Sequence, residues 1–151
     1  MVHAVQHLAR EERRPPTPEE IAYVEARTAE ALAICAAFAA ATERIKLGTG
    51  VVPIYTRTPA TMAQTAATID EISGGRMILG LGVSHRLIVE NWHGQTIDKP
   101  TTEMREYTQI VRAILGGTPP PASEKWPTNF GLSIPPHPDL PIYIAALSPK
   151  M

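Results

Sequence analysis

The fold is decided by residues 44–85, in which three segments stand out: R-I-K-L-G-T-G-V-V-P over Arg44–Pro53, T-R-T-P-A over Thr56–Ala60 and I-S-G-G-R-M-I-L-G-L-G-V-S-H over Ile72–His85. Two short apolar runs each end in glycine, and one segment of helix length joins them. Runs that are apolar on both faces are typical of covered parallel strands. The stretch therefore predicts neighbouring strands of a parallel barrel, with a ligand site at the glycine-marked strand ends.

Caps and helix breakers predict the elements on either side of this stretch. Thr58 followed by Pro59 is a typical helix start, and Ser73-Gly74-Gly75 is a typical stop. The predicted helices span Pro18–Ala41, Pro59–Ile72 and Thr101–Leu115, and the predicted strands span Ile45–Val52, Met77–Leu81 and Pro141–Leu147. We expect an irregular loop over Val83–Pro100 and neither long helix nor central strand in the proline-rich segment Thr118–Pro141.

The order helix, strand, helix, strand, helix, strand favours an α/β fold with right-handed crossovers and a parallel sheet. About three parallel strands and three main helices are too few for a closed eight-stranded barrel, so a partial (β/α)8 TIM barrel is predicted. Residues 1–16 are charged and aperiodic and are expected to form a disordered lead-in. Residues 17–151 are expected to form one domain.

Composition excludes several classes of function. The chain has 151 residues and a formal net charge of −1, without a basic block, so no nucleic-acid partner is expected. No apolar run approaches the roughly 18 residues of a membrane span. The single cysteine, Cys35, excludes an internal disulfide and is interpreted as a buried structural residue. These features favour a cytoplasmic protein.

Two glycine-rich segments are candidate sites. In Gly48–Val51, glycine allows close approach of a flat ligand, or a barrel corner or bulge without a ligand. In Gly80–His85, successive backbone amides and the Ser84 hydroxyl can cradle an anion. His85 stands where a dinucleotide fingerprint needs its third glycine, and Arg86 where a nucleophile elbow needs its last. His85 itself is either a general base, a phosphate contact or a solvated loop residue.

The remaining polar and aromatic residues indicate no further site. No histidine pairs with cysteine or carboxylates at metal-ligand spacing, so no metal is expected. Glu103 is interpreted as solvated helix surface. Trp92 and Trp126 are interpreted as packing anchors rather than as the cover of a pocket.

In combination, these motifs resemble the bacterial luciferase-like monooxygenases. The resemblance covers about Ala31 to Met151 and rests on the quoted segments together with the terminal I-A-A-L-S-P-K-M. Ser84-His85-Arg86 and Met104–Tyr107 are similar to the branch of oxidoreductases that use a deazaflavin coenzyme of the F-420 type. The resemblance implies a parallel barrel, of which this chain holds the second helix through the fifth strand.

The resemblance also implies roles for matching residues. Gly50-Val51 matches a non-proline cis peptide that backs the coenzyme ring. The loop Gly82, Val83, Ser84 and His85 matches the segment that approaches the phosphate-bearing tail. Ala146, Leu147 and Ser148 match the end of the fifth strand, which lines the same pocket.

Three departures from the family pattern limit what is carried over. Arg57-Thr58-Pro59 replaces the usual R-H-P, a change that keeps a helix cap. The first two strands and strands six to eight are missing, and with them the residues near the reacting ring and part of the tail site. The catalytic acid and base are therefore unknown.

The resulting hypothesis is an oxidoreductase that transfers a hydride between a deazaflavin and a small organic substrate, sometimes with oxygen. The alternative within the same fold is an FMN-dependent monooxygenase. The rival from another class is a non-catalytic fragment, because an open sheet leaves edges and an apolar face that invite association. Family members frequently dimerise through helices near this region, so a homodimer is the expected form of association.

Overall fold

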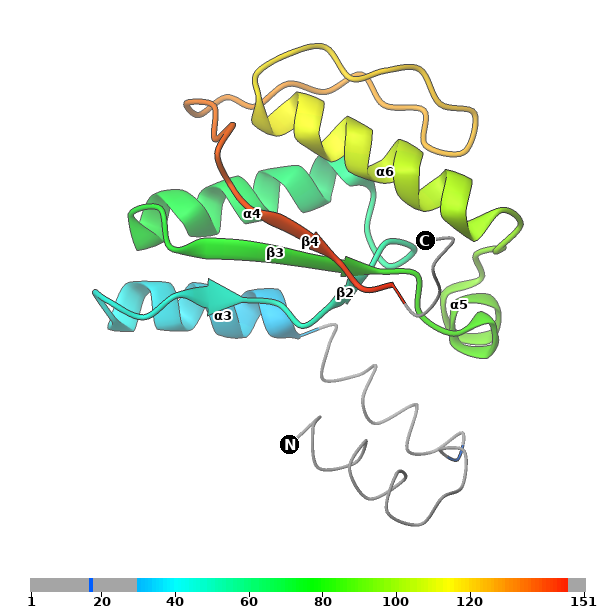
Figure 1. Ribbon diagram of the computed structural model, residues 1–151, viewed down its shortest axis with the longest axis horizontal. Coiled ribbons are helices and arrows are strands. Elements are labelled where there is room, and N and C mark those ends of the chain that lie inside the picture. Colours follow the sequence, from blue (N-terminus) through cyan, green and yellow to red (C-terminus); the bar gives the residue numbers. More distant parts are fainter. Residues whose placement is uncertain (1–16, 18–29, 147–151) are drawn as a thin grey trace.

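The computed structural model describes Thr17 and residues 30–146. The predicted lead-in, most of the first predicted helix and the end of the last predicted strand lie outside the described residues. In chain order the elements are α3 (Ala31–Ala41), β1 (Leu47–Gly48), β2 (Val52–Pro53), α4 (Pro59–Ser73), β3 (Met77–Gly82), α5 (Arg86–His93), α6 (Pro100–Leu115) and β4 (Ile142–Ile144) (Figure 1). The predicted alternation of helices and parallel strands is confirmed.

Strand β3 is the centre of the parallel sheet. On one edge, three amides donate to carbonyls of or next to β3: Leu47 to Arg76, Thr49 to Ile78 and Ile54 to Gly82. The three carbonyls are separated by even numbers of residues, so they point to the same edge of the strand. Strands β1 and β2 therefore pair with the same edge of β3. The prediction of a single strand over Ile45–Val52 is therefore wrong in one respect, because the strand is divided into β1 and β2. Strand β4 pairs with the opposite edge of β3 and is shorter than predicted.

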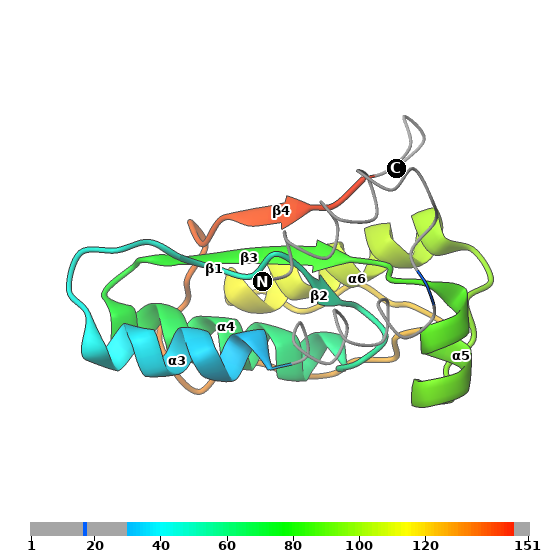
Figure 2. The same ribbon diagram turned by 90° about the horizontal axis from the view of Figure 1, so that it is seen from below.

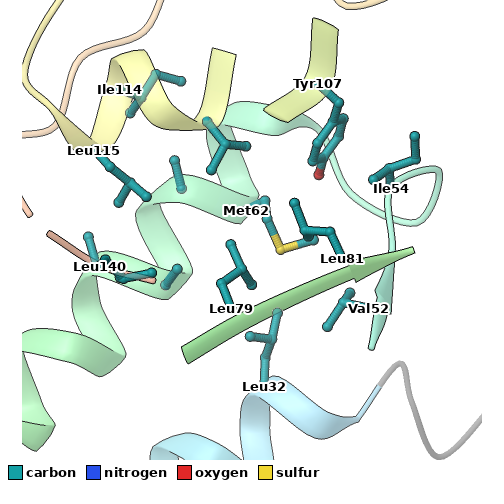
Figure 3. Close-up of a cluster of buried hydrophobic side chains, with 14 of the residues drawn as sticks. Leu32, Val52, Ile54, Met62, Leu79, Leu81, Tyr107, Ile114, Leu115 and Leu140 are labelled. Atoms are coloured by element: carbon teal, nitrogen blue, oxygen red, sulfur yellow. The ribbon is translucent and has the colours of Figure 1, made fainter. Parts of the chain in front are cut away.

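The helices α3, α4 and α6 form a layer against one face of the sheet, with α4 in contact with both of the others (Figure 2). Leu79 and Leu81 of β3 are fully buried in the core between sheet and helices, which also contains Met62 of α4 and Tyr107 of α6 (Figure 3). Gly80 and Gly82 alternate with these leucines and face the other way. Within the described residues, no helix covers that second face.

Local signals correctly predicted two helices. The Thr58 hydroxyl accepts a hydrogen bond from the amide of Thr61 at the start of α4, and Gly74 ends that helix in the left-handed region with a φ of 66°. The predicted apolar stripe of α6, consisting of Met104, Tyr107, Val111 and Ile114, is buried. No helix in the described part of the chain combines the length and apolarity needed to cross a bilayer.

The irregular loop predicted over Val83–Pro100 is wrong, because it contains helix α5. Ile88 and Val89 are buried on one side of this helix, and their amides donate to the carbonyl of His85. Gly94 ends it with a φ of 60°. The His85 side chain makes no capping hydrogen bond, so the usual signal for a helix start is missing from the sequence.

Two single-residue interpretations are confirmed and one is wrong. Cys35 is buried, and Trp126 is a packing anchor whose ring meets that of Tyr107 edge-on at 5.2 Å. Trp92, in contrast, is 52% exposed on α5.

Candidate functional site

The break between β1 and β2 is a one-residue bulge. From Ile78 to Gly82, β3 advances four residues between two hydrogen-bonded positions, whereas the neighbouring chain advances five, from Thr49 to Ile54. Such an extra residue bends the strand and redirects its side chains, and bulges are frequent beside active sites. The peptide bond between Gly50 and Val51, inside the bulge, is cis. The cis bond implied by the family resemblance is thus confirmed.

The hydroxyl of Thr49 replaces the sheet hydrogen bonds that the bulge interrupts. It accepts from the amide of Gly80 at 2.8 Å and donates to the carbonyl of the same residue at 3.0 Å. A hydroxyl can do both at once, because it has one donor and two acceptor positions. Both polar groups of Gly80 on this edge are therefore satisfied although the neighbouring backbone has moved away.

The bulge places Val51 over the two glycines of β3. A Cβ atom added at Gly82 would lie 2.7 Å from Cγ2 of Val51, and one added at Gly80 would lie 3.1 Å from Cγ1. A side chain at either position would therefore have to displace Val51. The bulge that the sequence offered as one explanation for glycine in Gly48–Val51 is present, and its packing also accounts for glycine at positions 80 and 82 without a ligand.

The bulge before β2 and the carboxyl ends of β3 and β4 form an apolar surface on the face without helices. Val51 is partly exposed there, and the Cβ of Ala145, itself exposed, lies 3.8 Å from the position that a Cβ of Gly82 would take. Tyr143, aligned with Gly80 across the sheet, is 65% exposed. We call the surface of Val51, Gly82 and Ala145 the strand-end platform.

The segment Val83–His85 leads from the platform into α5. Val83 packs against the hydrophobic core, and Ser84 adopts a left-handed φ of 64° that is uncommon for a residue other than glycine. His85 is exposed and holds the first turn of α5 with its carbonyl. Of the residues predicted at the end of the last strand, Ala146 is exposed, and Leu147 and Ser148 lie outside the described residues.

A polar cluster, missed in the sequence, lies on the helix side of the same end of the sheet. Glu103 is only 5% exposed, so its interpretation as solvated surface is wrong. Its carboxylate accepts a hydrogen bond from the hydroxyl of Tyr55, which follows β2, and lies 3.8 Å from Nζ of Lys125. The available signal was its spacing, because Glu103 precedes Tyr107 by four residues and so lies on the buried stripe of α6.

The buried tyrosines predict a loss of stability at alkaline pH. Burial, with the hydrogen bond and charge of Glu103, raises the pKa of Tyr55, and burial raises the pKa of Tyr107. Above about pH 10 the unfolded chain releases protons that the folded chain retains, so the free energy of unfolding falls, by up to about 1.4 kcal/mol per pH unit for each tyrosine.

Urea unfolding between pH 8 and pH 11 measures this effect. The substitution Tyr107→Phe should make the decline shallower above pH 10 while leaving it unchanged below that pH. An equally steep decline in the variant would contradict the assignment.

The described residues contain no group of three or more histidine, cysteine or carboxylate side chains that could hold a metal ion. His137, outside the platform, instead pairs with Asp70, with 2.8 Å between Nδ1 and Oδ2. This pair lies at the opposite end of the sheet, since Asp70 also accepts from the amide of Met77 at the start of β3.

Comparison with known proteins agrees with this architecture. The model of the luciferase-like monooxygenase family matches residues 12–151. The Mycobacterium tuberculosis protein Rv3520c, whose name provisionally assigns it to the coenzyme F420-dependent oxidoreductases, is 40% identical in an alignment that covers 72% of this chain and 36% of the relative.

Two solved structures have the same fold. The coenzyme F420-dependent tetrahydromethanopterin reductase of Methanopyrus kandleri superposes with a TM-score of 0.65 at 26% identity, over 89% of this chain and 48% of the reductase. The oxygenating constituent of 3,6-diketocamphane monooxygenase from Pseudomonas putida, solved with FMN, gives a TM-score of 0.65 at 20% identity, over 79% of this chain and 38% of that one. At this identity the second likeness concerns the fold alone.

The chain spans about a third to a half of the length of these relatives. Its sheet and helices correspond to part of a luciferase-like barrel. The family match over nearly the whole chain and the 40% identical relative establish that this chain belongs to the luciferase-like monooxygenase family.

Proposed function

We propose that the strand-end platform is one wall of the coenzyme site of an oxidoreductase that uses coenzyme F420. The observation that carries the proposal is the bulge, which turns Val51 onto the helix-free face beside Gly82 and Ala145. A smooth apolar surface at the carboxyl ends of parallel strands suits one face of a flat ring, and this end of a barrel is where ligands bind. The names of the relatives favour a deazaflavin as that ring.

The residues around the platform fit such a group by chemistry. Val51 and Ala145 would contact the ring, and the exposed His85 and the backbone of Ser84 would lie toward its phosphate-bearing tail. Bound there, the deazaflavin supplies hydride transfer to or from a small organic substrate, while the protein orients the ring and excludes water from one side. FMN is the alternative coenzyme, as in the monooxygenase of the same fold.

Fluorescence titration of the purified chain with coenzyme F420, and separately with FMN, tests the proposal. We expect saturable binding of coenzyme F420 at tens of micromolar or below, and weaker binding of FMN. The substitution Ala145→Trp places an indole on the platform and should weaken binding about tenfold or more, which corresponds to about 1.4 kcal/mol.

The matched control is Ala40→Trp, because Ala40 is exposed on α3, away from the strand ends. This variant should bind as the parent chain does, and both variants should retain the parent's melting temperature. A folded parent chain that binds neither coenzyme would reject the coenzyme site in this chain, leaving the non-catalytic fragment as the better description. Unchanged binding by Ala145→Trp would reject the platform as its location.

A further inference from the structure

We infer that Thr49 is the positioning residue of the platform: its hydroxyl, bound to both polar groups of Gly80, holds the bulge in place and thereby holds Val51 where a coenzyme ring would lie. The link to the coenzyme rests on the proposed function. The part that concerns the bulge rests only on the contacts of Thr49 and Val51.

The hydroxyl of Thr49 has no substitute as the hydrogen-bond partner of Gly80. Thr49 is 7% exposed, and Gly80 is buried, so water is largely excluded from the two hydrogen bonds. In a regular sheet the amide and carbonyl of Gly80 would pair with the backbone of the neighbouring strand. Here the extra residue of the bulge carries that backbone away from Gly80. A buried amide or carbonyl without a partner is strongly unfavourable, so Gly80 depends on the hydroxyl of Thr49.

The bulge lies close against β3, and this arrangement depends on the Thr49 hydroxyl, which takes the place of the missing backbone partners of Gly80. The carbonyl oxygen of Thr49 lies 2.2 Å from the position that a Cβ of Gly80 would take, and Val51 lies over the same glycine. Valine at position 49 has nearly the shape of threonine but cannot hydrogen-bond. With valine, segment 49–51 would have to rearrange to satisfy Gly80, and Val51 would leave the platform.

The test uses the full chain with three substitutions. Thr49→Val removes the hydroxyl, Thr49→Ser retains it, and Thr68→Val is the matched control, because Thr68 is exposed and bonds only within α4. Amide hydrogen exchange of Gly80 is measured by NMR without coenzyme, and the affinity for coenzyme F420 is measured by fluorescence.

We expect exchange at Gly80 to be slow in the parent chain, Thr49→Ser and Thr68→Val, and at least tenfold faster in Thr49→Val. The affinity for coenzyme F420 should fall about tenfold or more in Thr49→Val and change less than about threefold in the other two. A merely structural role would lower the melting temperature but leave the affinity of the folded protein unchanged. The affinity of folded Thr49→Val therefore separates the two roles, and rescue by serine assigns the effect to the hydroxyl.

Several results would overturn the inference. Fast exchange at Gly80 in the folded parent chain would show that the hydroxyl does not hold the bulge, and this measurement decides the point even if Thr49→Val fails to fold. Loss of affinity in Thr49→Ser equal to that in Thr49→Val would assign the effect to the methyl group.

A second variant separates this inference from the proposed function. Val51→Ala removes both γ-methyl groups from the platform and leaves the hydrogen bonds of Thr49, so affinity should fall while exchange at Gly80 stays slow. Unchanged affinity would show that the bulge does not present Val51 to the coenzyme. If the parent chain binds neither coenzyme, the proposed function and the link to it are rejected, and the exchange at Gly80 still decides whether Thr49 holds the bulge.

Discussion

Replacing Gly80 by alanine should lower the free energy of unfolding by about 3 kcal/mol or more, which is the upper range for inserting a group into a packed site. The added Cβ would lie 2.2 Å from the carbonyl oxygen of Thr49 and 3.2 Å from its carbonyl carbon. Both atoms belong to the backbone, so a rotamer change cannot relieve the contact. The bulge or β3 must move, and the two hydrogen bonds of Thr49 are then lost.

Two other glycine substitutions serve as graded controls. A Cβ at Gly48 would have no neighbour nearer than 3.7 Å, an ordinary contact, so Gly48→Ala should change the free energy of unfolding by less than about 1 kcal/mol. Gly82→Ala should fall between the two, because its nearest neighbour is the side chain of Val51 at 2.7 Å, which can shift. Urea unfolding of the three variants gives the ranking, and equal stability of Gly80→Ala and Gly48→Ala would contradict the argument.

The glycine-marked strand ends show what the sequence predicts well. The strands were located by their apolar runs, and the helix between them by Thr58 and Gly74, because caps and strand patterns depend on residues close together in the chain. The family resemblance added the cis peptide at Gly50-Val51, which residue patterns alone do not reveal. Local signals and resemblance together therefore predicted the alternation of the main helices and parallel strands, whereas the place of the coenzyme site stays a prediction.

The contacts between distant residues were not predictable in the same way. Tyr55 and Glu103 are 48 positions apart, and Thr49 and Gly80 are 31 positions apart, so no local pattern pairs them. Glu103 was misassigned because a charged residue on a helix is usually solvated, and only tertiary packing makes it the partner of Tyr55. The same holds for α5, whose first turn is stabilised by the backbone of His85 and by burial rather than by a capping side chain.

Within the described residues, the side chain with the most hydrogen bonds to distant parts of the chain is that of Arg76, directly before β3. Its side chain is buried, and its guanidinium donates hydrogen bonds to five oxygens. Most are carbonyls at the ends of helices: Ser73 of α4, Ala39 of α3 and Thr42 just beyond α3, with Ile45 and the Thr42 hydroxyl completing the set. The last carbonyls of a helix carry partial negative charge and lack partners within the helix. One cation thus joins the ends of two helices to the start of the central strand.

Arg76→Met should therefore lower the free energy of unfolding by about 4 kcal/mol, because several buried carbonyls lose a charged donor that methionine cannot replace. Arg76→Lys should recover only part of the loss, since a single ammonium cannot reach oxygens on both helices as the planar fork does. Arg44→Met, at an exposed position close by, is the matched control and should have almost no effect. Urea unfolding of the three variants measures the differences. Full stability in Arg76→Lys would show that charge alone, without the geometry of the guanidinium, holds the two helix ends.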